Sequence, residues 1–151
     1  MVKNINITNR KAKFEYNLLA KYTAGLKLGG TEIKSIRLGE AQINEAFCQV
    51  KNNEVWIVNM YINEYEFGSY LNHKPTQVRK LLLQKKEIKQ ISKKISEKGY
   101  TIVPLKVFIS ERGFAKIEIA VAQGKKTHDK RQSLKEQDNK REIDRMKNAY
   151  K

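Results

Sequence analysis

The sequence predicts a mainly β protein with added helices, arranged as a small antiparallel barrel that is followed by a basic C-terminal tail. Two stretches alternate apolar and polar residues on both sides of a short turn, which is typical of β-hairpins. An amphipathic helical pattern lies between them. Large apolar residues become sparse from residue 124 onward. We therefore expect a barrel domain over residues 1–123 and a tail over residues 124–151 that is disordered when free.

The composition favours an anionic partner. The 151 residues contain 31 Lys and Arg against 16 Asp and Glu, which gives a net charge of +15. Such a surplus is typical of nucleic-acid binding, with an anionic membrane surface as the second possibility. No run approaches the ~18 apolar residues of a membrane span, and the N-terminus lacks the apolar core of a signal peptide. We therefore expect a cytoplasmic protein that binds no membrane.

The N-terminal elements are an arm, a strand and a short helix. Residues 1–12 are polar and basic, and we expect them to form a partly mobile arm. Alternation from Phe14 to Tyr22 favours a first strand. Apolar spacing over residues 24–37 favours a short helix that ends near Gly39, although the glycines within it weaken the helix.

A hairpin and a long loop follow. Residues 41–51 and 54–62 look like two strands joined across Asn52-Asn53, because Asn tolerates the positive φ of tight hairpin turns. Residues 64–74 have no clean period and are predicted to form a surface loop. Its aromatic side chains favour packing onto the barrel, with stacking on bases as the alternative.

The clearest helical pattern runs from Thr76 to Lys98, with Gly99 after its C-terminus. Its apolar stripe consists of Val78, Leu81, Leu82, Ile88, Ile91 and Ile95. Its other face carries eight cations against two anions, whereas a solvated face usually mixes the signs. We expect part of this face to meet phosphates, and a merely solvated face remains the alternative.

A second hairpin is predicted from residues 100–109 and 114–122, joined across residues 110–113. Pro104 cannot donate a hydrogen bond to a neighbouring strand, which indicates an edge or a bulge there. Five or six short antiparallel strands with an inserted helix suit a closed or nearly closed barrel.

Catalytic chemistry is not expected. His73 and His128 lie in different segments, and no nucleophile pattern accompanies either of them. Cys48 lies in a predicted strand and suits a small buried apolar side chain, and as the only cysteine it excludes a disulfide and a cysteine-rich metal site. The sequence therefore indicates no enzyme, no cofactor and no metal. His128, which is flanked by cations, suits stacking on an exposed base, with an ordinary surface histidine as the alternative.

Five stretches in a fixed order point to one family. They are Asn9–Ala12 with Glu15-Tyr16, Ala24–Arg37, Arg79–Leu83 with Glu87-Ile88, Gly99–Leu105, and Gly124–Lys126 with His128–Arg131. Together they make the chain resemble the small protein B family, the SsrA-binding proteins of bacterial trans-translation. The resemblance runs from about residue 9 to the last residue.

The resemblance implies an oligonucleotide-binding-type barrel that binds the tRNA-like domain of transfer-messenger RNA. Such a protein delivers this RNA to stalled ribosomes, where the nascent chain is tagged and the ribosome is rescued. The implied partners are transfer-messenger RNA, the small ribosomal subunit with its 16S rRNA, and the 70S ribosome. We expect a monomer, one per transfer-messenger RNA.

The resemblance also implies two sets of site residues. The set for the tRNA-like domain is Asn9, Arg10, Glu32, Lys34, Arg37, Arg79 and Lys80. Glu32 would accept a hydrogen bond from a base or a 2′-hydroxyl. The set for the decoding centre and the tail is Lys125, Lys126, His128, Asp129, Lys130, Arg131 and Met146. Arg145 departs from the apolar residue usual in the family, so we expect a weaker apolar contact there.

Two other functions remain open at this stage. A basic ribosomal or translation-factor-like protein would bind ribosomal RNA only, without preference for a tRNA-like fold. A basic module for membranes or protein partners would bind anionic vesicles as well as RNA. The scarcity of leucine and aromatic residues in the tail argues against this function.

Overall fold

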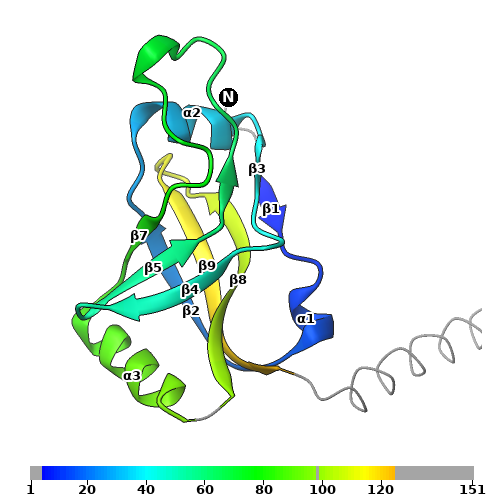
Figure 1. Ribbon diagram of the computed structural model, residues 1–151, viewed down its shortest axis with the longest axis vertical. Coiled ribbons are helices and arrows are strands. Elements are labelled where there is room, and N and C mark those ends of the chain that lie inside the picture. The colour runs from blue at the N-terminus through cyan, green and yellow to red at the C-terminus, as the bar shows by residue number, and fades with distance from the viewer. Residues whose placement is uncertain (1–4, 98, 125–151) are drawn as a thin grey trace, which may run out of the picture.

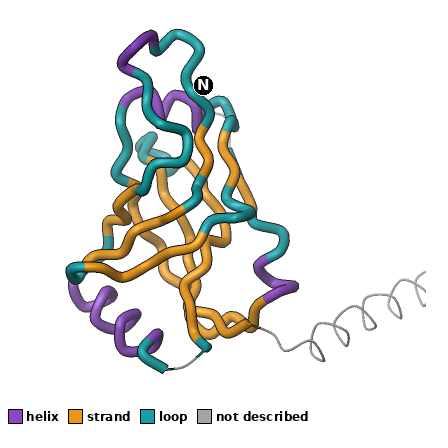
Figure 2. Tube along the Cα trace, viewed as in Figure 1, coloured by secondary structure: helices purple, strands orange, loops and turns teal. Residues whose placement is uncertain are grey.

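The computed structural model of the protein describes residues 5–97 and 99–124, and strands hold more of these residues than helices do (Figures 1 and 2). The strands are β1 (Asn6–Thr8), β2 (Tyr16–Leu26), β3 (Ala41–Gln42), β4 (Phe47–Lys51), β5 (Glu54–Val58), β6 (Tyr61–Ile62), β7 (Arg79–Leu82), β8 (Tyr100–Ile109) and β9 (Ala115–Gly124). The prediction of a mainly β protein with added helices is confirmed.

A closed antiparallel barrel forms the centre of the molecule. Its strands follow the order β8-β4-β5-β7-β2-β9, and β9 pairs back onto β8. β1 adds to the outer edge of β8, while β3 and β6 pair separately as a two-stranded sheet. The long β8 also shows a register shift between Pro104 and Lys106, which confirms the predicted irregularity at this proline.

Strand alternation fills the barrel with apolar side chains. Val55 and Ile57 on β5, Leu81 on β7 and Ile117 on β9 are all fully buried in one core. The hairpin between β4 and β5 turns where it was predicted, with positive φ values of 54° at Asn52 and 59° at Asn53. The hairpin between β8 and β9 is confirmed as well.

Two helices lie at opposite ends of the barrel (Figure 1). α2 (Gly30–Arg37) buries Ile36, and α3 (Lys85–Ile95) buries Ile88 and Ile91. A third, one-turn helix, α1 (Ala12–Glu15), packs Ala12 against the outer side of β8 and β9. A 3-10 turn, η1 (Ser69–Leu71), lies in the loop that projects above α2.

The predicted helix over residues 76–98 is wrong in its first part. Residues 79–82 form β7, which pairs with β5 and β2 and thereby closes the barrel. The helix begins only at Lys85. The apolar run at residues 81–83 is compatible with the apolar stripe of a helix and with a buried strand. Residues 79–82 form a strand because they pair with β2 on one side and β5 on the other. The basic face is split as a result, because Arg79 points into the interior.

The N-terminal predictions also need correction. Residues 6–8 of the expected mobile arm pair with β8. The first strand begins at Tyr16 and continues to Leu26, so Phe14 belongs to α1 and the predicted helix shortens to α2. The first strand of the predicted hairpin, over residues 41–51, is divided into two separate strands, β3 and β4. The tail was predicted over residues 124–151; Gly124 is the last residue of β9, and residues 125–151 lie outside the described residues.

Candidate nucleic-acid interface

The α2 end of the barrel is organised around a buried ion pair. Glu32 is the third residue of α2, and one of its carboxylate oxygens accepts a hydrogen bond from the Gly29 backbone N–H at 3.0 Å. An acid in this position favours the start of a helix. The other carboxylate oxygen accepts a hydrogen bond from Nε of Arg79. Glu32 is 4% exposed and Arg79 is 3% exposed, so each side chain neutralises the other inside the protein.

The remaining donors of Arg79 bind backbone carbonyls on the neighbouring segments. Nη1 donates to Met60 O at 2.7 Å, and Nη2 donates to Lys74 O at 3.3 Å and Pro75 O at 3.1 Å. Arg79 therefore joins the start of α2 to both ends of the segment over residues 60–75. The rigid fork of a guanidinium suits this role, because a single side chain holds several acceptors in fixed directions.

The pair also sets the protonation state of Glu32. Burial opposes ionisation of this carboxyl, but the Gly29 N–H and the Arg79 guanidinium together outweigh burial and lower its pKa below the ordinary value. Glu32 is thus held as a carboxylate. Its charge is matched inside the protein rather than presented to solvent.

Two predicted site residues are exposed on the outer side of α2. Lys34 lies over the ring of Tyr65, with Nζ 5.4 Å from the ring centroid. Arg37 donates from Nη2 to Gly113 O at 3.2 Å, which ties α2 to the turn between β8 and β9. Both cations can still reach a ligand outside the protein, so α2 offers positive charge at a defined place.

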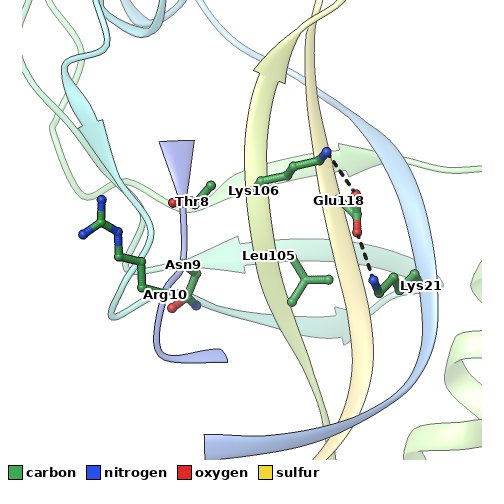
Figure 3. A pocket seen from close by; sticks show the side chains of 7 residues that line it. All are labelled: Thr8, Asn9, Arg10, Lys21, Leu105, Lys106 and Glu118. Atoms are coloured by element: carbon green, nitrogen blue, oxygen red, sulfur yellow. Dashed lines mark ion pairs between the residues drawn. The ribbon is translucent and has the colours of Figure 1, made fainter. Parts of the chain in front are cut away.

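Asn9 and Arg10 lie elsewhere, in a groove on the outer face of the sheet (Figure 3). The groove has a volume of about 500 Å³. Glu118 at its side contacts two lysines, with 3.8 Å to Lys21 and 3.6 Å to Lys106. Asn9 is fixed by donating from Nδ2 to Pro104 O at 3.0 Å, and its Oδ1 is buried without a hydrogen-bond partner among the described residues. The groove is thus lined by three cations, Arg10, Lys21 and Lys106, and by the carboxylate of Glu118.

The structure does not bring the whole predicted set together. Among the described residues, no hydrogen bond or ion pair joins Asn9 or Arg10 to α2. Lys80 faces outward from β7 and pairs with Glu54 at 3.5 Å. The other predicted residues lie outside the part of the chain that the structure describes: Lys125, Lys126, His128, Asp129, Lys130, Arg131, Arg145 and Met146.

Sequence reasoning missed Lys21 and Lys106. Both are lysines in strands whose other face is apolar, so an outward direction could have been predicted from alternation alone. It also missed that Glu32 pairs with Arg79, because the two residues are 47 positions apart. Cys48 is buried, and burial raises the pKa of its thiol, which suits the expected apolar role.

Other kinds of site find no support in the described residues. No group of three or more His, Cys, Asp or Glu side chains within residues 5–97 and 99–124 could hold a metal ion. Among the helices of these same residues, none is long and apolar enough to cross a membrane.

Comparison with known families gives the context for these features. The model of the SmpB protein family matches residues 6–149. The chain belongs to this family. Every stretch that carries the resemblance in the sequence falls within the matched range.

Relatives in the SmpB family are similar over nearly their whole length. An SsrA-binding protein of Flavobacterium johnsoniae is 55% identical over 150 residues, covering 99% of each chain. One from Cytophaga hutchinsonii is 54% identical over 147 residues, covering 97% of this chain and 96% of the relative. A solved structure described as "tmRNA-SmpB: a journey to the center of the bacterial ribosome" matches with a TM-score of 0.69 and 42% identity. It covers 82% of this chain and 86% of that chain.

Proposed function

We propose that this protein binds the tRNA-like domain of transfer-messenger RNA and delivers it to stalled ribosomes for trans-translation. The observation that carries the proposal is the near-complete match to SsrA-binding proteins at 50–55% identity. The solved neighbour is an SmpB protein studied with tmRNA and the bacterial ribosome, which supports both partners. The net charge of +15 suits a protein that lies between two RNAs.

The residues of the tRNA-like-domain site take two roles in this proposal. The exposed cations Arg10, Lys34 and Arg37 and the half-buried Lys80 bind phosphates, and Asn9 holds the neighbouring Arg10 in place through its hydrogen bond to Pro104 O. Glu32 and Arg79 hold α2 and the neighbouring loop in place for that contact. This positioning role follows from their burial, which leaves little surface for a ligand.

The tail set takes the ribosomal role. Lys125, Lys126, Lys130 and Arg131 contact ribosomal RNA near the decoding centre, His128 stacks on an exposed base, and Met146 supplies an apolar contact. β9 ends at Gly124, which pairs with Tyr16 at the start of β2, so the last described residue lies at the end of the barrel away from α2 (Figure 1). This placement supports a two-surface arrangement in which one end binds the tRNA-like domain and the other faces the ribosome.

The protein acts by binding, without catalysis, as a cytoplasmic monomer with one copy per transfer-messenger RNA. A basic protein that binds ribosomal RNA only is the alternative. It differs in a measurable way, because charge alone gives affinities that fall together with salt for any structured RNA.

A gel-shift salt series tests the proposal. The purified protein is titrated into the tRNA-like domain of transfer-messenger RNA and into an unrelated structured RNA of equal length. We expect the cognate RNA to stay bound at salt concentrations that release the control RNA. Equal loss of both RNAs would favour the ribosomal-RNA alternative.

Truncation after Gly124 tests the two-surface arrangement. We expect the shortened chain to bind the tRNA-like domain as well as the full chain does, but to give no tagging on stalled ribosomes. Full tagging by the shortened chain would refute the assignment of the ribosomal role to the tail.

A further inference from the structure

The loop over residues 63–74 projects beyond α2 (Figure 1). Three large apolar side chains near its tip are exposed. Tyr70 is 91% exposed, Phe67 is 77% exposed and Leu71 is 74% exposed. Single exposed apolar residues are common on protein surfaces, but three within five positions on one projection are not expected without a use. The prediction that this loop packs onto the barrel does not describe its tip.

The base of the loop is closed by a single asparagine. Asn72 donates from Nδ2 to Tyr65 O at 2.7 Å, and its Oδ1 accepts from the Tyr65 N–H at 3.0 Å. The same Oδ1 accepts from the His73 N–H at 3.3 Å. The ring of Tyr65 meets that of Phe67 edge to face, with centroids 5.7 Å apart. The tip is thus carried on an ordered base, which lowers the entropy lost when it binds a partner.

The loop is also fastened to α2. The Thr31 hydroxyl lies 2.9 Å from Nδ1 of His73, whose Nε2 lies 2.9 Å from Ile62 O. Lys34 of α2 lies over the Tyr65 ring, and the buried Arg79 donates a hydrogen bond to Lys74 O at the end of the loop. The exposed rings therefore keep a defined position relative to the cations of α2.

The charges around the tip decide what kind of contact it can make. Lys34 and Arg37 on α2 are exposed and can attract a phosphate backbone. On the loop itself Glu64 and Glu66 are exposed beside the rings, and these acids disfavour phosphates at the tip. An RNA held by α2 can therefore meet the tip with its bases rather than with its backbone.

We propose that Tyr70 and Phe67 stack on unpaired bases of the RNA that α2 binds. This inference rests on the proposed function. Bases that are splayed out of loops are recognised by stacking on aromatic side chains, and each stack contributes affinity without regard to phosphate charge. The loop then supplies recognition that is insensitive to salt, next to the salt-sensitive cations of α2.

Binding of tyrosine variants to the tRNA-like domain of transfer-messenger RNA tests the proposal. We expect Tyr70→Ala and Phe67→Ala each to raise the Kd by at least about fivefold while the slope of log Kd against log salt stays unchanged. Tyr70→Leu keeps an apolar side chain without a ring, so it should bind as weakly as Tyr70→Ala. Leu19→Ala, at an exposed leucine of β2, is the matched control and should bind like the unaltered protein.

A fluorescence measurement gives a second, direct readout. Tyr70→Trp keeps a ring for stacking and should retain affinity, and its emission should be quenched when the RNA binds. The protein has a single natural tryptophan, Trp56 on β5, so the unaltered chain provides the background signal.

The outcomes separate the two proposals. If the unaltered protein does not distinguish the tRNA-like domain from the control RNA, the proposed function fails and the loop inference fails with it. If it does distinguish them but the Tyr70 and Phe67 variants bind normally and Tyr70→Trp is not quenched, only the loop inference is overturned. Normal binding of Tyr70→Leu beside weak binding of Tyr70→Ala would indicate an apolar pocket as partner and would also overturn stacking.

Discussion

The two ends of the barrel are built from different interactions. At the α2 end a buried ion pair, Glu32 with Arg79, joins a helix to a loop through hydrogen bonds to backbone groups. At the α3 end Ile88 and Ile91 pack into the core, and most lysines of the helix remain in solvent. Lys94 is an exception, since its Nζ contacts the Tyr22 hydroxyl at 2.9 Å.

This difference indicates a division of roles. Apolar packing attaches α3 firmly but places its lysines only approximately, because long exposed side chains keep their rotamer freedom. Buried hydrogen bonds to a guanidinium have narrow geometry, so the α2 end fixes the relative position of helix and loop. We expect the α2 end to recognise a particular RNA shape, and we expect the lysines of α3 to make no defined contact with that RNA.

Arg79→Met should cause the largest loss of unfolding free energy among the changes at the α2 end. The substitution leaves the Glu32 carboxylate buried without its partner and removes the donors to three backbone carbonyls. Breaking a buried ion pair in this way costs about 3–5 kcal/mol of unfolding free energy. Chemical denaturation monitored by circular dichroism measures the change.

The matched control for Arg79→Met is Lys89→Met on the exposed face of α3, which should change stability by less than about 0.5 kcal/mol. The double variant Glu32→Gln with Arg79→Met removes the unpaired charge and should recover at least about 1 kcal/mol. A stable Arg79→Met single variant would show that the pair does not hold the α2 end.

Ile91→Ala tests the opposite end. Ile91 is fully buried under α3, and its truncation leaves a cavity that costs about 2–4 kcal/mol of unfolding free energy. Because α3 is not placed by polar contacts to α2, the folded variant should keep its affinity for the tRNA-like domain, as measured by gel shift. Loss of affinity in a fully folded Ile91→Ala sample would mean that the two ends are not independent.

Acid should weaken the α2 end selectively. The folded-state pKa of Glu32 is lowered, so its contribution to stability is present above the unfolded-state pKa and is lost as the pH falls through the folded-state pKa. Glu32→Gln should be less stable by about 1.5–3 kcal/mol at neutral pH, because a charged hydrogen bond is lost. Denaturation midpoints at a series of pH values should show this gap closing in acid. A gap that stays constant would contradict the assigned ionisation of Glu32.

Local patterns explain how much of this fold was predictable from the sequence. The turn at Asn52-Asn53 and the hairpin with Pro104 follow from short-range rules, and both are confirmed. β7 was missed because a run of three leucines satisfies helix and strand patterns alike. Its strand identity comes from pairing with β2 and β5, which no local window contains.

The candidate site was predictable in composition but not in arrangement. The cations of α2 were assigned to the site by the family resemblance, whereas the burial of Glu32 and Arg79 depends on the strand β7, which was missed. Within β7, Arg79 and Leu81 share the inward face. If residues 79–82 had been predicted as a strand, a buried partner for the Arg79 charge would have been expected as well. The exposed tip of the loop had no sequence signal, since the same aromatic residues suit packing and stacking.

The smallest effects should separate the cations at the two ends. Lys34→Gln removes one exposed charge from α2, and we expect it to reduce the slope of log Kd against log salt for the tRNA-like domain by about 1. Lys89→Gln removes a charge from α3 and should leave that slope unchanged. Lys34→Arg keeps the charge above Tyr65 and should restore the slope. Equal reductions by Lys34→Gln and Lys89→Gln would contradict this difference between the ends and would show that both cations contact phosphates of this RNA, because only a cation that contacts a phosphate releases a counterion.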